Sequence, residues 1–212
     1  MNMSDICYIF GAGERSDVDI KLDKDDLVIA ADGGFDYLES LGLRADFVLG
    51  DFDSVVSYDL PSDAIRYPRD KDDTDMMLAV KLGLEKNYKE FVIYGGLGGR
   101  IDHTFANICV LIYLSKHGAT GILYGKNTAI QAVNNGSIVF GKDSSFNVAG
   151  NTVSIFSLDR HCHNVSVSGL KWELSGADLY NHDPVGVSNE FTGKRAIVSV
   201  NKGSIVAIYH LL

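Results

Sequence analysis

Hydrophobic residues in the first half of the chain form short continuous runs, separated by longer amphipathic segments. Each run has the length of a buried strand and is closed by Gly or Asp, which is typical of parallel strands covered on both faces. This alternation predicts an α/β fold with a doubly wound, mainly parallel sheet. The predicted strands are 7–10, 27–31, 46–50, 91–96 and 120–125, and the predicted helices are 35–41, 74–86 and 103–117.

Two of the predicted helices carry further information. Segment 74–86 has apolar residues at helical spacing, and either Asp73 or Thr74 can cap its start. Segment 103–117 is apolar on almost every side, so we expect it to be deeply buried.

The second half of the chain follows a different period. Apolar and polar residues alternate over short segments that Gly, Asn and Asp separate, which predicts an antiparallel β-sandwich or barrel. We therefore place an α/β domain at 1–125 and a β-sandwich domain at 126–212. The strands predicted for the sandwich are 137–140, 151–158, 164–170, 195–201 and 203–211.

Charge is unevenly distributed between these halves. The net charge is −9; residues 1–125 hold 22 acidic against 12 basic residues, whereas residues 126–212 hold 6 against 7. An acidic half argues against nucleic acid as a partner, because a phosphate backbone needs a basic surface. It suits a site where divalent cations join carboxylates to a polyphosphate. An acidic surface that serves only solubility is the alternative.

Composition indicates where the protein works. No apolar run approaches the ~20 residues that a membrane helix needs. The N-terminus has no basic segment of the kind that begins a signal peptide. The three cysteines, Cys7, Cys109 and Cys162, are too scattered for a disulfide framework, which favours a reducing cytoplasm.

Four polar clusters follow strands of the predicted sheet or begin its helices. Ligands of open α/β sheets bind at the carboxyl ends of the strands, so we expect the clusters to share one site. Turn and capping roles explain any one cluster but not the shared position. The clusters are Ala31-Asp32-Gly33-Gly34, Gly50 to Ser54, Asp70 to Asp75, and Gly95 to His103.

The aspartates of these clusters predict a metal site. Asp51 and Asp53 lie two residues apart after a predicted strand, so both side chains point to one face. Asp72 and Asp75 are three apart at a helix start, again on one side. Carboxylate oxygens are the hard ligands that Mg²⁺ takes together with water and substrate phosphates. Capping and turn roles are the alternative.

The glycine cluster from Gly95 to His103 matches neither a P-loop nor a dinucleotide-binding fingerprint. Its glycines still offer backbone N–H groups at a helix start, which forms an anion site, and Arg100 can hold phosphate bidentately. Asp102 and His103 can anchor this loop or contact a nucleotide, and a purely structural role for His103 is an equal alternative.

Two further features of the second half favour structural roles over ligand binding. In an alternating strand, His161 and His163 face away from Cys162, which argues against a metal site formed by all three. The single tryptophan, Trp172, is of a type found more often in a core than in a ligand site.

Together these motifs resemble the thiamine pyrophosphokinase family, and the similarity extends in order through nearly the whole chain. The resemblance implies an α/β catalytic domain, a β-sandwich and a homodimer. It also implies Mg²⁺-dependent transfer of the terminal pyrophosphate of ATP to thiamine, giving thiamine diphosphate and AMP. The matching stretches are Asp32-Gly33-Gly34, Gly50 to Ser54, Lys71-Asp72-x-Thr74-Asp75, Gly95 to His103, Gly169 to Leu174, and Ser188-Asn189-Glu190.

The resemblance implies roles for single residues in the first half. Asp73, an extra acid within Lys71 to Asp75, departs from the family pattern and affects the register of the metal ligands. The implied metal and catalytic set is Asp51, Asp53, Asp72 and Asp75, and the implied ATP contacts are Asp32, Gly33, Lys71, Thr74, Gly98, Gly99, Arg100, Asp102 and His103.

In the second half, the resemblance implies a thiamine site. Trp172 would stack on thiamine, with Ser188 and Asn189 nearby, and the sandwich of one subunit would complete the site of the other. Many bacterial relatives carry Tyr where this chain has Trp172, and an aromatic role survives that exchange.

Two other functions are open from the residues. A metal-dependent phosphohydrolase also uses an Asp-x-Asp pair such as Asp51 and Asp53 after a strand, but the turn with Thr that accompanies it is missing here. A non-enzymatic ligand-binding module built on the sandwich would leave the aspartates without a role.

Overall fold

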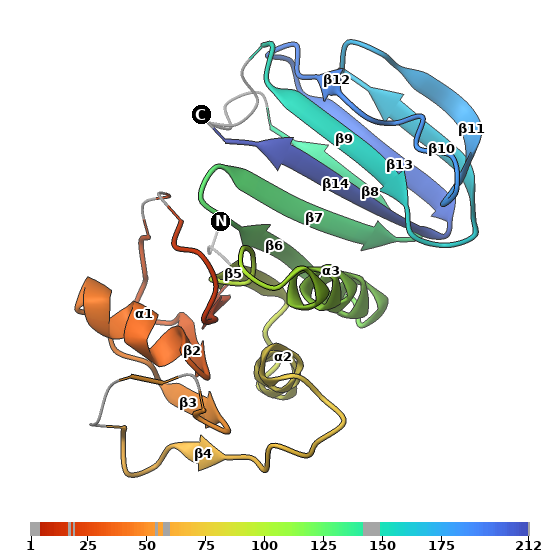
Figure 1. The fold of residues 1–212 in the computed structure, drawn as a ribbon. Coiled ribbons are helices and arrows are strands. Elements are labelled where there is room, and N and C mark those ends of the chain that lie inside the picture. Colours follow the sequence, from red (N-terminus) through yellow and green to blue (C-terminus); the bar gives the residue numbers. More distant parts are fainter. Residues whose placement is uncertain are drawn as a thin grey trace. The chain divides into compact units, whose positions relative to one another are not determined.

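The computed structural model describes residues 5–16, 18, 20–53, 55–56, 60–141 and 149–211; Ser54 of the second polar cluster lies outside the described residues. The chain divides into two compact units. The first, the α/β unit, comprises residues 1–110 and 117–126, and the second, the β unit, comprises residues 111–116 and 127–212. Each unit has its own layers of secondary structure (Figure 1).

Strands and helices alternate through the α/β unit. The strands are β1 (Ile6–Phe10), β2 (Leu27–Ala31), β3 (Phe47–Gly50), β4 (Ile65–Arg66), β5 (Glu90–Tyr94) and β6 (Thr120–Tyr124); the helices are α1 (Gly34–Leu41), α2 (Asp75–Glu85) and α3 (Ile101–Lys116), whose last residues belong to the β unit.

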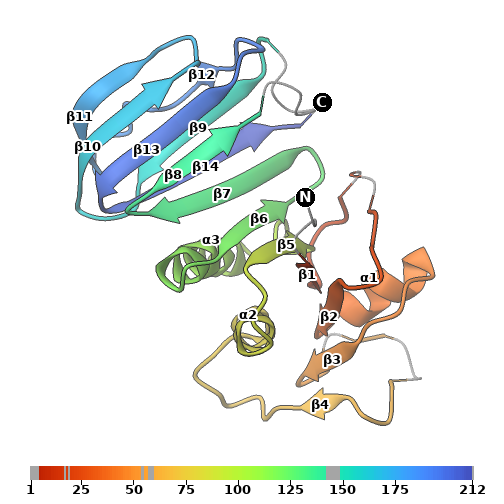
Figure 2. The same ribbon diagram turned by 180° about the vertical axis from the view of Figure 1, so that it is seen from behind.

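The α/β unit is built on one parallel sheet. Its strands lie in the order β6-β5-β1-β2-β3-β4, and all five pairings are parallel. Because β1 and β2 are almost continuously apolar and buried, helices can cover both faces, and α1 and α2 lie on opposite sides of the sheet (Figure 2). The predicted α/β fold with a mainly parallel sheet is confirmed. The strand order reverses direction between β1 and β5, which is the position where such sheets bind ligands.

Two antiparallel layers form the β unit. One has the order β12-β9-β14-β7 and the other β11-β10-β13-β8. Phe140, Phe191 and Tyr209 meet edge to face in its core, with ring centroids 5.1 and 5.3 Å from Phe140. The strands are β7 (Thr128–Asn134), β8 (Ser137–Phe140), β9 (Thr152–Ser157), β10 (His161–Ser168), β11 (Leu174–Tyr180), β12 (Asn189–Glu190), β13 (Ala196–Lys202) and β14 (Ser204–His210).

Helix α3 departs from expectation. Val110, Leu111 and Leu114 are buried, but Ile101 is 84% and Phe105 59% exposed. The prediction that this helix is deeply buried is therefore wrong, because the part of the chain that the structure describes covers only one side of it. No helix among the described residues is long and apolar enough to cross a membrane.

Candidate active site

A cavity of about 440 Å³ lies in the α/β unit where the strand order reverses. The loops after β1, β2 and β5 and the starts of α2 and α3 line it. Of the predicted site residues, Asp32, Lys71, Thr74, Asp75, Gly98, Gly99, Arg100 and His103 lie along this cavity. The structure thus brings most of the predicted ATP contacts together.

Backbone hydrogen bonds join the loops after β1 and β5 into one wall of the cavity. The N–H of Gly11 donates to the carbonyl of Tyr94 at 2.8 Å, and the N–H of Gly13 donates to the carbonyl of Gly95 at 2.7 Å. A Cβ at Gly13 would lie 2.3 Å from the carbonyl oxygen of Leu97, so only glycine permits this approach.

Asn107 anchors the same loop from α3. Its buried Nδ2 donates to the carbonyl of Gly96 at 2.7 Å. Sequence reasoning missed Asn107, although an amide inside an otherwise apolar helix is a signal, since a buried polar group needs a partner. Gly98 has a φ of 82°, and its exposed neighbour Gly99 a φ of 64°, so the loop turns outward before α3 begins.

Arg100 and Asp102 form a pair at the rim. Nε of Arg100 donates to Oδ1 of Asp102 at 3.1 Å, and a terminal nitrogen of the guanidinium contacts Oδ2. The Arg100 hydrogen bond is the main reason that the pKa of Asp102 falls to about 2, and the His103 N–H adds to this effect. Asp102 therefore orients Arg100, while His103 lies exposed on the cavity wall.

Three carboxylates converge beside the cavity. Oxygen atoms of Asp32, Asp51 and Asp53 all lie within 4.8 Å of one another. Asp51 and Asp53 lie in the same group, but Phe52 between them has a φ of 64°, so the segment turns here and is not extended as expected. The N–H of Asp53 donates to Oδ1 of Asp51 at 3.2 Å. Arg69, which sequence reasoning missed, lies 3.7 Å from Asp53.

Asp32 is the buried member of this group. It is 9% exposed and has a φ of 51°, which is uncommon outside glycine. Its Oδ1 is shielded from solvent and has no hydrogen-bond partner among the described residues. A buried, unpaired carboxylate oxygen next to two further carboxylates fits a cation site, because a cation compensates the cost of burial.

Lys71 lies between two of the aspartates. Its Nζ is 3.5 Å from Oδ2 of Asp51 and 3.2 Å from Oδ1 of Asp75. Burial alone would lower the pKa of Lys71. The net shift is nevertheless upward, because Asp75 and then Asp51 stabilise the charged ammonium through hydrogen bonds and charge. The Asp53 N–H is the main cause of a lowered pKa at Asp51, whereas burial raises the pKa of Asp75 in spite of Lys71.

The segment before α2 differs from its predicted geometry. Thr74 is the N-cap, and its hydroxyl accepts the N–H of Met77 at 3.2 Å, so one of the two predicted caps is observed. Asp73 contacts Nζ of Lys81 at 2.5 Å. Asp72 precedes the helix, is exposed and does not line the cavity. The helical spacing expected to align it with Asp75 therefore does not apply.

Gly33 has a structural position. It is buried and forms the N-cap of α1, and it does not line the cavity. Its neighbour Gly34 lies against β1, where a Cβ would meet the carbonyl oxygen of Phe10.

The β unit has a second, smaller cavity of about 150 Å³. Trp172 and Asn189 line it, with apolar residues that include Val185 and Val187. Oδ1 of Asn189 accepts a hydrogen bond from the backbone N–H of Trp172 at 3.1 Å, and Nδ2 of Asn189 donates to the backbone carbonyl of Trp172 at 2.7 Å. The indole is 53% exposed, so Trp172 is not the core residue that its type alone suggested. Ser188 is exposed nearby and does not line this cavity.

Comparison with protein families gives two matches in chain order. Residues 18–123 match the family described as "Thiamin pyrophosphokinase, catalytic domain", and residues 139–205 match "Thiamin pyrophosphokinase, vitamin B1 binding domain". The chain belongs to the thiamin pyrophosphokinase family. The resemblance read from the motifs is confirmed, and the chain is an enzyme of this family rather than a non-enzymatic module.

Individual thiamin pyrophosphokinases are similar over most of the chain. The thiamine pyrophosphokinase of Bacillus subtilis is 28% identical over 192 residues, 88% of each chain. Thiamin pyrophosphokinase 1 of Caenorhabditis elegans is 26% identical over 168 residues, 76% of this chain and 68% of the relative. A crystal structure of the Bacillus subtilis enzyme superposes with a TM-score of 0.82 at 26% identity, covering 98% of this chain and 99% of the other.

Proposed function

We propose that this chain transfers the pyrophosphoryl group of ATP to the hydroxyl of thiamine, giving thiamine diphosphate and AMP. The observation that carries the proposal is the cavity of the α/β unit, which a glycine-rich loop, an arginine and Asp32 line, with the carboxylates of Asp51 and Asp53 within 4.8 Å of that of Asp32. Family membership supports it, because these are the parts that a polyphosphate transfer requires.

The triphosphate of ATP would lie along the glycine loop. Gly98 and Gly99 offer backbone N–H groups at the start of α3, where the helix dipole favours negative charge. Arg100, already oriented by Asp102, would hold phosphate oxygens bidentately. Lys71, which also lines the cavity, adds a further cation. These groups would fix the phosphates for attack in line with the leaving AMP.

Asp32, Asp51 and Asp53 would hold Mg²⁺. The unpaired, buried oxygen of Asp32 and the three carboxylates within 4.8 Å match the oxygen ligands that this ion takes. When bound, Mg²⁺ neutralises charge on the phosphates and orients them. Asp75 would act beside this group with Lys71, and the cavity aspartates include the acceptor of the thiamine hydroxyl proton. Asp72 has no role in this arrangement.

Thiamine would bind at the small cavity of the β unit. The positively charged thiazolium ring favours an aromatic face, and the exposed Trp172 provides one. Asn189 holds the backbone of Trp172, so it positions the indole instead of contacting thiamine.

The active enzyme would be a homodimer in which the sandwich of one subunit completes the active site of the other. Exposed apolar residues support a subunit interface: Ile101 and Phe105 on α3 and Val185 and Val187 in the β unit are each about half exposed or more. A buried interface would remove this apolar surface from water.

A reducing cytoplasm is the proposed location. Cys7 and Cys162 are buried and Cys109 is exposed, and all three are free thiols. Burial raises the pKa of Cys7 strongly, so this thiol is unreactive and serves the core.

One assay tests the function. The purified chain is incubated with ATP, Mg²⁺ and thiamine, and nucleotides and thiamine esters are separated by chromatography. We expect AMP and thiamine diphosphate in equal amounts, because attack at the β-phosphorus transfers two phosphates at once. Formation of ADP with thiamine monophosphate would show stepwise kinase chemistry, and free phosphate without a thiamine ester would show a phosphohydrolase.

A further inference from the structure

Two histidines and an aspartate meet on one face of the β unit. His161 and His163 alternate along β10 with Cys162, which is fully buried and has its Sγ 3.3 Å from the carbonyl of Ser204. The predicted alternation is thus observed. The two imidazoles share the opposite face, with ring centroids 3.6 Å apart, and Asp178 of the neighbouring strand β11 joins them. A single-strand pattern could not show this third residue.

A β-bulge sets the position of Asp178. Between the pairs Cys162–Leu179 and Val165–Ala177, β10 has two residues where β11 has only Asp178. One of the two, Asn164, has a φ of 51°, and its N–H donates to Oδ1 of Asp178 at 3.2 Å. This hydrogen bond orients the carboxylate and leaves its other oxygen toward the histidines.

The ligand atoms of the three side chains lie within 4.8 Å of one another, so a single ion can be within reach of all three. Oδ2 of Asp178 lies 2.9 Å from Nε2 of His161 and 3.6 Å from Nδ1 of His163. Tetrahedral ligands at the usual zinc distances are about 3.4 Å apart, between these two values. Nε2 of His161 is shielded from solvent, yet within the described residues it forms no aligned hydrogen bond.

We propose that His161, His163 and Asp178 bind a borderline divalent transition-metal ion such as Zn²⁺, with water in the remaining position. Two imidazole nitrogens and one carboxylate oxygen favour Zn²⁺ over the harder Mg²⁺. Tyr180 stacks on the His161 ring at 4.4 Å and 14°, which limits rotation of the imidazole. The side chains are 29 to 45% exposed, so an ion can enter.

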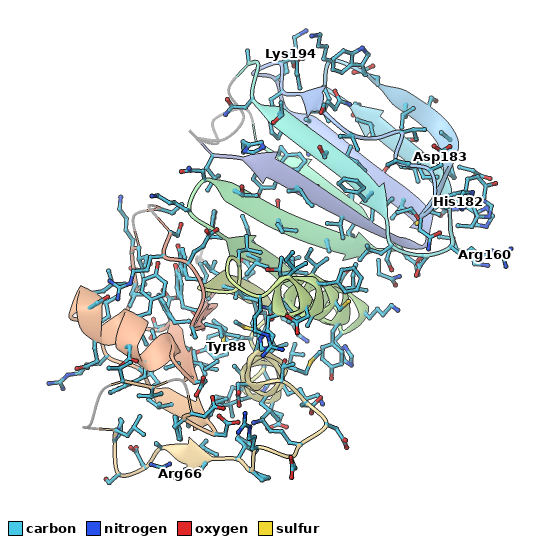
Figure 3. All side chains as sticks on the ribbon, viewed as in Figure 1. Arg66, Tyr88, Arg160, His182, Asp183 and Lys194 are labelled. Atoms are coloured by element: carbon cyan, nitrogen blue, oxygen red, sulfur yellow. The ribbon has the colours of Figure 1, made fainter. Side chains whose placement is uncertain are left out.

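The position of this site separates it from the proposed catalytic metal site. It lies where β10 begins and β11 ends, the end of the β unit at which Figure 3 labels Arg160 and His182. The carboxylates of Asp32, Asp51 and Asp53 belong to the α/β unit. Metal binding at the histidines can therefore be measured without reference to catalysis.

The experiment is a titration of the full chain, stripped of metal by chelation, with Zn²⁺ followed by calorimetry and with Co²⁺ followed by visible absorption. Millimolar Mg²⁺ is present throughout, so that the carboxylate group of the α/β unit is saturated. The variants are His161→Ala, His163→Ala and Asp178→Asn, and the matched control is His210→Ala, an exposed histidine at the end of β14.

We expect one Zn²⁺ per wild-type chain, and tetrahedral Co²⁺ absorption in the same stoichiometry. Each ligand variant should bind at least about 100-fold more weakly, since loss of a group that merely orients a ligand already costs about 10–100-fold. His210→Ala should bind as the wild type does. Asp178→Asn preserves shape and tests the site if a histidine variant fails to fold. The proposal is overturned if the wild type binds no Zn²⁺ in Mg²⁺ buffer, or if folded ligand variants retain wild-type affinity.

Discussion

At the scale of single residues, the carboxylates of the candidate active site come from different segments. Asp32 follows β2, Asp51 and Asp53 follow β3, and their oxygens lie within 4.8 Å of one another. Lys71 connects Asp51 to Asp75 and so offsets part of the negative charge. Under the proposed function, these carboxylates would hold Mg²⁺, and the nearby cations would contact the phosphates of ATP.

Asp51→Asn tests the role of the carboxylate group. The amide keeps the shape of the side chain but loses the charge that would hold Mg²⁺, so we expect turnover to fall by about 10²-fold or more with the fold intact. Turnover is measured at saturating Mg²⁺ and both substrates, and the fold by circular dichroism. Asp70→Asn, an exposed aspartate of the next loop, is the control. Wild-type turnover in Asp51→Asn would remove the pair from the mechanism.

The Arg100–Asp102 pair gives a prediction for pH. The pKa of Asp102 is lowered from an ordinary 3.8 to about 2, so the pair stabilises the fold above pH 3.8, and this contribution is lost as the pH falls through about 2. Carbon NMR of the Asp102 carboxyl should give a midpoint near 2, and Arg100→Gln should move it toward 3.8. An unchanged midpoint in Arg100→Gln would show that the backbone, and not the arginine, sets this pKa.

The sequence identified several residues of the cavity in the α/β unit, but it did not give all of their geometry. Asp51 and Asp53 could be grouped because only Phe52 separates them, although its φ of 64° shows that the segment is not extended. The closeness of Asp32 to them depends on the pairing of Ala31 with Leu49 between β2 and β3, which no local pattern reveals. Asp72 was placed by helical spacing, but the helix begins only at Asp75.

At the scale of elements, two loops form one wall of the cavity in the α/β unit. The segments after β1 and β5 are joined by hydrogen bonds from Gly11, Gly13 and Glu14. These bonds form at the reversal of strand order, where the carboxyl ends of β1 and β5 lie side by side. If the proposed ATP site is correct, this wall would hold phosphate without prior rearrangement, which favours tight positioning.

Gly13→Ala tests this wall. The added Cβ would lie 2.3 Å from the carbonyl oxygen of Leu97, so the loops must separate. We expect the variant to lose about 1–3 kcal/mol of stability, which would lower its Tm. Its KM for ATP should also be higher than that of the wild-type protein. Ser62→Ala, a change at an exposed residue that does not line this cavity, should leave both values unchanged. A Gly13→Ala variant with normal Tm and KM would show that the loops are not tightly joined.

Continuous apolar runs and helical segments were predictable, whereas several strands of the β unit were not. β7 was missed because its buried positions come in adjacent pairs and do not alternate with a period of two. β2 and α1 were found within one residue of their ends, because β2 is a continuous apolar run and α1 a short helical segment. β11 was missed because it lies at a sheet edge, where its polar sequence LSGADLY is compatible with solvent. β4 and β12 have two residues each and carry no period.

At the scale of the whole molecule, the proposed function assigns different halves of the reaction to the two units. The α/β unit holds the larger cavity with its glycine-rich loop and aspartates, and the β unit holds the Trp172 cavity. Such a division suits an enzyme whose substrates differ in charge, and under the proposed dimer it also separates the two binding events between subunits.

Trp172→Ala tests the thiamine site and the dimer together. Loss of the aromatic contact should raise the KM for thiamine by about 10-fold, since such contacts contribute about 1–2 kcal/mol, with little effect on the KM for ATP. The Trp172→Ala and Asp51→Asn proteins are then mixed under conditions that allow subunit exchange. At low thiamine concentration, the mixture should regain activity. Half the dimers would be mixed and each would have one intact site, so recovery should approach a quarter of the wild-type rate. Proven exchange without recovery would mean that each subunit builds its site alone.

The unpaired oxygen of Asp32 has opposite consequences for the stability of the fold and for the activity of the enzyme. Its left-handed backbone and buried charge are unfavourable for folding, and the chain retains them at the site where a cation would compensate. Asparagine tolerates the same backbone conformation and carries no charge. We therefore expect Asp32→Asn to have a free energy of unfolding about 1 kcal/mol higher than that of wild type in the absence of Mg²⁺. It should also lose most of its turnover. Equal thermal stability of the two proteins in the presence of chelator would contradict this prediction. A more stable but inactive variant would show that Asp32 lowers the stability of the fold and is required for activity.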